Sequence, residues 1–324
     1  MAPNCFLHRR AQLRARPQFS ADLTSAFLAL PRDVVESEIA CLSDSVRAGR
    51  HRLNFSPGES LFVHGASFAH LGLPGILFAC VAALVAGCVD AMVGGGGLIQ
   101  VPALLFLMPR TPVLALGTNK VASFVGTSTA AARYLRVTKV EWRETAPMAL
   151  VALIGSLCGA HAASLMPATL LDSIVLAAMV AIGIYLWRNK TLGVVEDLRF
   201  DGLVRIGIMG TGGLVIGFWD GMAGPGTGSL LIFFLVGVVG FEFVRASAVS
   251  KVVNCATNLG ALIVFAPGGS VAWGLAAAMA VCNLSGALIG TALAATRGSA
   301  FIRKIFFGVV SLLIISVAGK LAFG

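Results

Sequence analysis

Long apolar runs follow one another along the chain from about residue 71 onward, and short polar turns separate them. The longer runs hold about 20 residues each, which in a helix is enough to cross the ~30 Å hydrocarbon core of a bilayer. No stretch shows the alternation over ~10-residue blocks that is typical of membrane barrels. The pattern therefore predicts an all-α integral membrane protein with about 8–10 transmembrane segments.

The apolar runs fall into two sets with the same order. We expect first-half helices at about 72–93, 97–108, 112–134, 144–163 and 167–187. We expect second-half helices at about 202–220, 225–240, 245–266, 271–294 and 301–321. The matching order predicts an internal duplication. The expected parts are a basic, poorly ordered N-terminal extension (1–70), a first transmembrane repeat (71–187), a polar loop (188–201) and a second transmembrane repeat (202–324).

One stretch near the start of each half is repeated. Its copies each contain a single carboxylate, Asp90 or Asp220, 130 positions apart, and then a cluster of glycines. The glycines concerned are Gly94, Gly95, Gly96 and Gly97 in the first copy, and Gly224 and Gly226 in the second. Such a sequence cannot continue as a regular helix, and a break at membrane depth must face protein or a watery cavity. We therefore predict two glycine-broken helices whose amide ends attract an anion.

The charges of the loops predict the orientation of the two halves. The loop after the 112–134 helix is basic, whereas its counterpart at 266–271 is uncharged. The loop at 164–168 is uncharged, whereas its counterpart at 295–304 is basic. Since cytoplasmic loops carry the excess of Lys and Arg, the halves are predicted to have opposite orientation, as an inverted repeat. Whether the short segments after the glycine breaks cross the membrane or re-enter it stays open.

Composition excludes a soluble protein. The chain is 57% hydrophobic and 12% charged, against about 45–50% and about 25% in soluble domains. Its net charge of +9 lies mainly in the N-terminal segment and in loops, which indicates membrane orientation and not binding of nucleic acid. Its seven cysteines lack paired spacing. We therefore expect no disulfide framework, no metal site and no cofactor.

One lysine lies near the start of the helix that follows each break. Lys120 and Lys251 are 131 positions apart, so the repeat extends to them. A stripe of hydroxyl and amide side chains follows each lysine on one helix face, because positions three and four apart are neighbours on a helix. A lysine beside such short polar side chains suits an oxyanion. The stripes contain Ser123, Thr127 and Thr129 after the first lysine, and Asn254, Thr257 and Asn258 after the second.

Lysine segments and breaks together supply the candidate substrate-binding residues. From the lysine segments these are Thr118, Asn119, Lys120, Ser123, Lys251, Asn254 and Asn258. From the breaks they are Gly94, Gly95, Gly96, Gly97, Gly224, Gly226, Thr227 and Ser229. Gln100 and Pro102, just past the first break, are weaker candidates to line the same cavity. No nucleophile with an adjacent base is evident, so no catalytic residue is assigned.

Asp90 and Asp220 are candidates for proton coupling or for ion pairs. Each is almost the only acid in a long apolar run, where an unpaired carboxylate is costly. They could form static salt bridges with the lysines, or they could take up and release a proton as an anion leaves. The lysines could instead reach the membrane interface, and the glycines could serve only close helix packing. The residues alone leave these alternatives open.

At these motifs the chain resembles the TauE/SafE family of sulfite and organosulfonate exporters, and within it the branch of probable membrane transporter proteins. The similarity covers about residues 72–322 in unbroken order. The motifs that carry it are Val89–Gly97, Ala115–Lys120, Trp219–Ser229 and Lys251–Asn258. Residues 1–70 have no counterpart in the family pattern. The resemblance implies secondary transport of small sulfur-containing anions such as sulfite or sulfonates, often outward.

We therefore expect a multi-pass exporter of small anions in a bacterial inner membrane, working by alternating access. Lys120 and Lys251 would neutralise the anion, and Asp90 or Asp220 would couple its movement to protons. An anion channel with the same polar residues is the alternative, and a membrane-bound enzyme is a weaker one. The expected partners are the small anion and the lipid bilayer. The sequence indicates no oligomeric state.

Overall fold

The structure is a computed structural model that describes residues 71–109, 111–175, 177, 181, 197–294 and 296. The predicted N-terminal extension and the predicted helix at 301–321 lie outside these residues. So do most of the polar loop at 188–201 and much of the predicted helix at 167–187. The boundaries of the predicted repeats therefore stay predictions.

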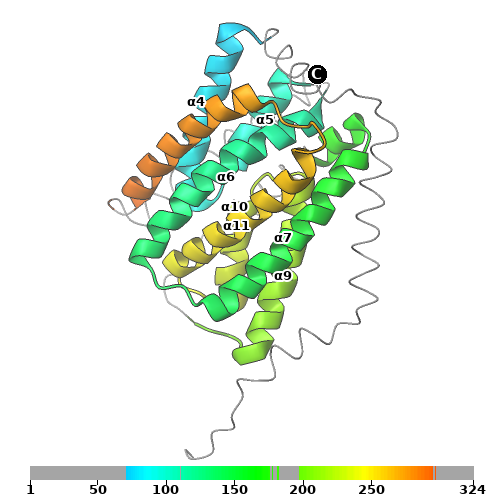
Figure 1. Cartoon of the computed structure of the whole chain (residues 1–324). Helices are drawn as coiled ribbons and strands as arrows, with labels where there is room; N and C mark the ends of the chain where they lie inside the picture. The colour runs from blue at the N-terminus through cyan, green and yellow to red at the C-terminus, as the bar shows by residue number, and fades with distance from the viewer. Residues whose placement is uncertain are drawn as a thin grey trace, which may run out of the picture. The chain divides into compact units, whose positions relative to one another are not determined.

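The prediction of an all-α fold is confirmed, because every regular element in the described residues is a helix. Where a predicted helix lies wholly among them, its observed ends fall within three residues of the predicted ones. The helices labelled in Figure 1 are α4 (Gly72–Val93), α5 (Gly97–Leu107), α6 (Pro112–Val137), α7 (Trp142–Leu165), α9 (Gly202–Met222), α10 (Thr227–Phe234) and α11 (Phe243–Phe265). A π-helix, η1 (Leu235–Val239), continues α10, and a further helix covers Trp273–Ala294.

Five helices are long and apolar enough to cross a membrane: α4, α7, α9, α11 and the Trp273–Ala294 helix. Large apolar side chains are exposed on their surfaces, among them Leu73, Leu77 and Val81 of α4. Buried positions, in contrast, include lysine, aspartate and amide side chains. This distribution is the reverse of that in a soluble protein and fits a surface that faces lipid. The chain is therefore a multi-pass membrane protein.

Helix α6 has the length of a spanning helix but not its apolar composition. It contains 26 residues, but its sequence is too polar for it to count among the five apolar helices named above. Its polar residues are buried, including Thr118, Asn119, Lys120 and Thr127. Because these side chains face protein, α6 can lie at the centre of a membrane bundle without exposing them to lipid.

The first glycine break turns the chain back on itself. Gly94 follows α4 in a left-handed backbone conformation (φ 79°), which glycine adopts at little steric cost. Helix α5 then runs back along α4. Its last residue, Leu107, lies beside the start of α4, because a Cβ added to Gly75 would be 3.5 Å from Leu107 Cδ2. With 11 residues, α5 is about 16 Å long and too short to cross the ~30 Å core. Helices α4 and α5 therefore form a hairpin.

The second break forms a hairpin of the same kind. Helix α9 ends at Met222, and α10 begins after Gly226, whose backbone is also left-handed (φ 74°). Beyond η1 the chain returns to the segment that precedes α9, where the Asp197 N–H donates to the Gly240 carbonyl at 2.9 Å. Each short segment thus leads back to the end at which its hairpin begins.

The tips of the two hairpins contact each other. The Ser229 N–H donates to the Gly94 carbonyl at 3.0 Å, and the Ser229 hydroxyl donates to the Val93 carbonyl at 2.9 Å. A Cβ on Gly94 would lie 2.2 Å from the Gly228 carbonyl carbon, so only glycine fits between the tips. Helices α4 and α9 begin at opposite ends of the bundle (Figure 1). This is the arrangement expected of an inverted repeat, although the duplication itself stays a prediction.

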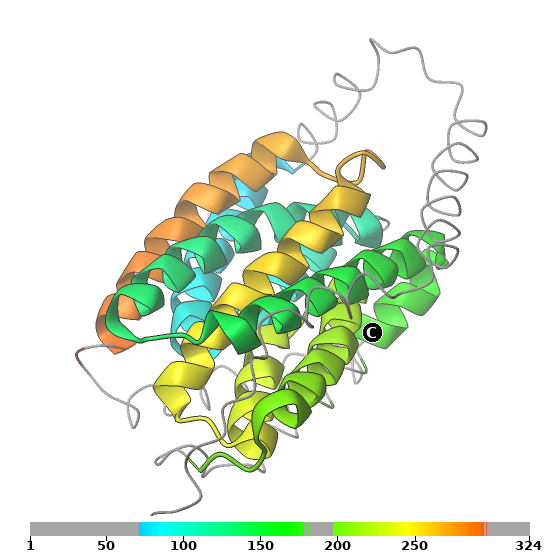
Figure 2. The same ribbon diagram turned by 60° about the horizontal axis from the view of Figure 1, so that its bottom comes forward.

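Packing between the predicted halves is reciprocal. Helix α7 lies beside α9, and the Trp273–Ala294 helix lies beside α4 (Figure 2). A Cβ on Gly155 or Gly159 of α7 would lie 2.4 or 2.0 Å from a carbonyl oxygen of α9. A Cβ on Gly286 or Gly290 would lie 2.0 or 2.2 Å from a carbonyl oxygen of α4. These four glycines, spaced as small-xxx-small pairs, allow the backbones to approach closely.

Helices α7, α9 and α11 begin at one ion cluster. Glu144 of α7 pairs with Arg205 of α9 at 2.6 Å and with Arg245 of α11 at 3.5 Å. Arg245 also pairs with Glu141 at 3.5 Å and lies 4.2 Å from the ring centre of Phe241. Both guanidinium groups and the Glu144 carboxylate are largely buried. The cluster therefore ties the start of the α9 hairpin to its two neighbours.

The close contact between α7 and α9 gives a stability prediction. Gly159→Ala would place a Cβ 2.0 Å from the Phe218 carbonyl oxygen, so the two helices would have to separate. We expect the change to lower the free energy of unfolding by about 1–3 kcal/mol. Gly210→Ala on α9 is the matched control, because nothing lies within 4 Å of the added Cβ. Equal melting temperatures of the two variants in detergent would contradict this packing.

Candidate functional site

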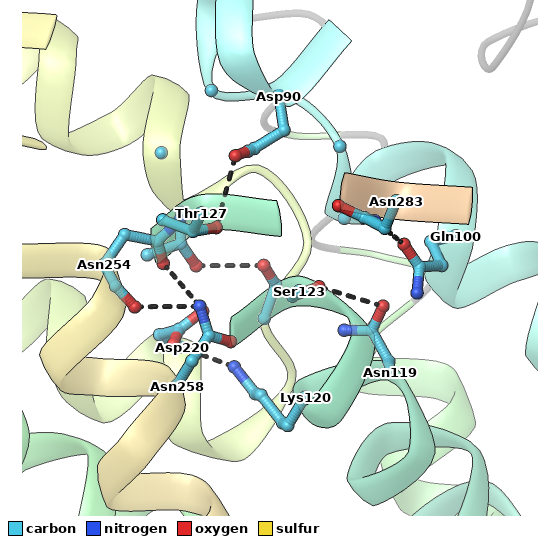
Figure 3. A pocket seen from close by; sticks show the side chains of 16 residues that line it. Asp90, Gln100, Asn119, Lys120, Ser123, Thr127, Asp220, Asn254, Asn258 and Asn283 are labelled. Carbon is cyan, nitrogen blue, oxygen red and sulfur yellow. Dashed lines mark hydrogen bonds and ion pairs between the residues drawn. The ribbon is translucent and has the colours of Figure 1, made fainter. Parts of the chain in front are cut away.

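A polar cavity lies where the two hairpin tips meet (Figure 3). Its empty space, including the part open to solvent, is about 370 Å³. Among the described residues, only glycines and charged, amide or hydroxyl side chains line it. They are Asp90, Gly94, Gly96, Gly97, Gln100, Asn119, Lys120, Ser123, Thr127, Asp220, Gly224, Thr227, Gly228, Asn254, Asn258 and Asn283. The cavity thus offers hydrogen bonds and charge but no apolar side chain.

Two buried ion pairs connect the hairpins with the lysine helices. Lys120 Nζ of α6 lies 2.8 Å from Asp220 Oδ2 of α9. Lys251 Nζ of α11 lies 2.8 Å from Asp90 Oδ2 of α4 and also donates to the Asp90 carbonyl. Each lysine therefore pairs with the aspartate of the other predicted half. The lysine side chains are 1% and 0% exposed, so neither reaches the membrane interface.

The four charged groups leave the site without net formal charge. Two ammonium groups face two carboxylates, and all four lie in the interior of the bundle. Removing one partner of such a pair costs about 3–5 kcal/mol, because it leaves an uncompensated buried charge. The geometry therefore supports the ion-pair alternative that the sequence left open. It also means that neither lysine is free of a counter-ion.

Four residues of the hydroxyl and amide stripes face the same cavity (Figure 3): Ser123, Thr127, Asn254 and Asn258. Thr129 and Thr257 do not line it, and their hydroxyls donate to carbonyls of their own helices, at 2.9 and 3.1 Å. The Thr127 hydroxyl donates to Asp90 Oδ2 at 3.4 Å, and the Ser123 hydroxyl donates to Asn119 Oδ1 at 3.4 Å. Asn258 Nδ2 donates to the Asn254 carbonyl at 2.8 Å. These contacts orient the polar side chains and connect the carboxylate of Asp90 with helix α6.

The first residues of the two short helices contribute backbone donors. Gly96, Gly97 and Gly228 line the cavity. Their N–H groups donate to no acceptor among the described residues. The start of a helix carries unpaired N–H groups and the positive end of the helix dipole, which together favour an anion. The first residues of α5 and α10 thus offer backbone N–H groups that could bind an anion without an ionised side chain.

Five of the predicted site residues do not line the cavity: Thr118, Gly95, Gly226, Ser229 and Lys251. Thr118 donates to the Leu114 carbonyl at 2.7 Å and accepts from the Ala272 N–H at 3.0 Å. Ser229 holds the hairpin tips together, and Lys251 pairs with Asp90. These side chains position the residues around the cavity.

The remaining predicted residues do line it, together with some that the prediction missed. The structure brings together Asp90, Gly94, Gly96, Gly97, Asn119, Lys120, Ser123, Asp220, Gly224, Thr227, Asn254 and Asn258. Gln100, a weaker candidate, also lines it, whereas Pro102 does not. Thr127, named only as part of a stripe, Gly228 and Asn283 complete it. Asn283 could have been found, because a lone amide within an apolar span is costly and therefore suggests function.

The arrangement has the chemical groups of a binding site for a polar ion. It combines ammonium groups, hydroxyls, amides and backbone N–H groups around an internal space. No group of three His, Cys, Asp or Glu side chains in the described part of the chain is placed to hold a metal ion. The hydrogen-bonding groups are those that recognise oxyanions, and the carboxylates are groups that can take up a proton.

Comparisons with known proteins agree with a membrane transporter. The chain is 33% identical over 243 residues to "Probable membrane transporter protein ORF9" of Sinorhizobium sp., which covers 75% of this chain and 90% of that protein. It is 35% identical over 237 residues to a "Probable membrane transporter protein" of Haemophilus influenzae, with 72% and 89% covered. It is 32% identical over 231 residues to "Probable membrane transporter protein YfcA" of Escherichia coli K12, with 71% and 84% covered.

No solved structure matches the chain. The profile of the family described as "Sulfite exporter TauE/SafE" matches residues 79–317. That range includes both glycine breaks, both lysines and all sixteen residues around the cavity. The chain therefore belongs to the sulfite exporter TauE/SafE family of membrane transporters.

Proposed function

We propose that this protein is a secondary carrier of small sulfur-containing oxyanions, such as sulfite or sulfonates, in a bacterial inner membrane. Its family description names a sulfite exporter, and the relatives are named membrane transporters. On this basis we propose export as the physiological direction. The observation that carries the proposal is the polar cavity with two crossed ion pairs between the hairpin tips.

Charge balance suggests how an anion and a proton would bind together. Each lysine is already neutralised by a carboxylate, so an added anion would leave the buried site with an excess negative charge. If Asp90 or Asp220 takes up a proton as the anion binds, the lysine exchanges one counter-ion for another and the net charge stays zero. The anion would then move together with a proton, so that net export would be driven by the outward concentration gradient of the anion and not by an inward proton gradient.

Exchange of counter-ions offers a route to alternating access. Each ion pair joins one hairpin to a helix of the other predicted half. Breaking a pair would loosen one such connection while the anion holds the lysine. The hairpins could then move against each other around a site that remains between them, as in other carriers with broken helices.

The contact between the tips favours a carrier over an anion channel. Backbone groups of Gly94 and Ser229 are hydrogen bonded directly beside the cavity. An open pore through this point would require that contact to break. A carrier needs to open the site to only one side at a time.

Replacement of a lysine tests the site. Lys120→Gln removes the ammonium group that faces the cavity, and a hydrogen bond to a charged group contributes about 1.5–3 kcal/mol. We expect the affinity for labelled sulfite in proteoliposomes to fall by about 10–100-fold. Lys139→Gln changes an exposed lysine just beyond α6 and should have no effect. Transport by both variants at the wild-type rate would refute the site.

Replacing both members of an ion pair tests whether the pair only stabilises the fold or also takes part in transport. Asp90→Asn or Lys251→Gln alone should lower stability by about 3–5 kcal/mol, whereas the double variant should recover most of it. A pair that only locks the fold would let the double variant transport again. We expect the recovered protein to remain inactive in sulfite uptake, and wild-type uptake by it would show a purely structural role.

Asp220→Asn tests the exchange of counter-ions. It leaves Lys120 without its carboxylate, so sulfite should raise the melting temperature of this variant more than that of the wild type. An inward proton gradient should accelerate sulfite uptake by the wild type but not by the variant. Asp201→Asn, at an exposed position before α9, is the control. A proton-driven uptake that survives in Asp220→Asn and Asp90→Asn would exclude these carboxylates as the coupling groups.

A further inference from the structure

One wall of the cavity is an uncharged pair of amides. Asn283 Nδ2, from the Trp273–Ala294 helix, donates to Gln100 Oε1 of α5 at 2.7 Å. The two residues are 4% and 1% exposed. In Figure 3 the pair lies across the cavity from Asn254 and Asn258. The cavity therefore has a neutral polar wall in addition to the walls that carry the ion pairs.

This amide pair breaks the repeat pattern of the chain. The aspartates recur after 130 positions and the lysines after 131. The position 130 residues after Gln100 is Leu230, and the position 131 residues before Asn283 is Ala152. The equivalent positions thus hold apolar residues, Leu230 in α10 of the second half and Ala152 in α7 of the first. Since apolar residues fit the same framework at these positions, the amides are not required by helix packing.

Gln100 retains a hydrogen-bond donor that the protein does not use. Its Nε2 group is buried and has no partner among the described residues. A buried donor without a partner costs about 1–3 kcal/mol, and at a cavity wall that cost is removed when a ligand accepts the hydrogen bond. The donor is therefore available to a ligand that enters the cavity.

Asn283 holds Gln100 in position. The backbones of Gly87 and Gly126 leave room for its side chain, because a Cβ on them would lie 2.9 and 1.8 Å from Asn283 Oδ1. Two helices thus enclose Asn283, and its amide group in turn fixes Oε1 of Gln100. With the oxygen held, the amino group of Gln100 remains for the cavity. Asn283 acts here as a positioning residue.

We propose that Gln100, positioned by Asn283, is a specificity-determining residue that donates a hydrogen bond to a second polar group of the substrate. The lysine would bind the anionic group, and Gln100 would bind a hydroxyl or carboxylate oxygen of the substituent. Because the side chains that line the cavity in the described residues are charged, amide or hydroxyl groups, a polar substituent can find a hydrogen-bond partner there. The substrate class is therefore small sulfonates with a polar substituent. This proposal rests on the proposed function.

Two sulfonates of equal size and charge test the proposal. In 2-hydroxyethanesulfonate a hydroxyl occupies the position of the terminal methyl group of propanesulfonate. Competition of each compound with labelled sulfite is measured for the full-length protein in proteoliposomes. We expect the wild type to prefer the hydroxylated compound by about 10-fold or more, because a site built to bind a hydroxyl rejects the analogue that lacks it.

Variants that copy the other half of the chain remove the donor or its support. Gln100→Leu reproduces Leu230, and Asn283→Ala reproduces Ala152. Both should bring the preference to within about threefold of unity, while the melting temperature and the elution profile in detergent confirm that each variant is folded. Asn283→Gln, which keeps an amide, should retain part of the preference.

The outcomes distinguish this proposal from the proposed function. Equal competition by the two sulfonates in the wild type, with sulfite transported, overturns the specificity proposal alone. A preference that persists in Gln100→Leu overturns it as well, because another group must then bind the hydroxyl. Absence of sulfite transport in the wild type overturns the proposed function and the specificity proposal together.

Discussion

Two ammonium groups buried within a membrane bundle need counter-ions, and here each counter-ion comes from the opposite helical hairpin. Lys120 pairs with Asp220 and Lys251 pairs with Asp90, both at 2.8 Å. A buried charge that loses its partner is strongly destabilising. The ion pairs therefore hold the lysine helices against the hairpin tips. The ion pairs thus bring the polar face of each lysine helix to the cavity.

The glycine breaks make the ion pairs possible. In a continuous helix, the backbone N–H and carbonyl groups that follow Asp90 would all be hydrogen bonded within the helix. The break instead ends α4 just after the aspartate and turns α5 back beside it. The second break does the same after Asp220. The two tips are in direct contact, so that a residue larger than glycine does not fit between them. The same feature provides unpaired N–H groups, the carboxylates and the cavity between them.

The site combines a balanced charge with unused hydrogen-bond donors. The N–H groups of Gly96, Gly97 and Gly228 and the amino group of Gln100 have no acceptor among the described residues. The oxygen atoms of a ligand in the cavity could accept these hydrogen bonds. The balanced ion pairs, in turn, would oppose an anion that enters without a proton. In our proposal the donors determine which anion binds, and the ion pairs determine what moves with it.

Sequence reasoning predicted the helices and the breaks well because both depend on local properties. Apolar run length sets the helix ends, and a glycine cluster after Asp90 or Asp220 interrupts a helix wherever it occurs. It also identified both lysines and most residues around the cavity. Charge in the loops indicated two opposed halves, and the hairpins begin at opposite ends of the bundle (Figure 1).

What the sequence could not give were contacts between residues far apart in the chain. The crossed choice of partners is one example, since Asp90 pairs with Lys251, 161 positions away, and not with Lys120. Thr118 and Ser229 had the chemistry of ligands, but their hydroxyls make other hydrogen bonds. The Thr118 hydroxyl donates to Leu114 of its own helix, and the Ser229 hydroxyl donates to Val93 of α4. Asn283 stood out only as a lone amide in an apolar span, and its partner Gln100, 183 positions away, is brought beside it only by folding.

The central claim is that an oxyanion binds between the hairpin tips. A structure of the protein with selenite, an oxyanion related to sulfite whose selenium scatters anomalously, would test this most directly. The account predicts one anomalous peak within the cavity, near Lys120 Nζ and the N–H groups of Gly97 and Gly228. A peak outside the cavity, or none there at concentrations that block sulfite transport, would contradict it.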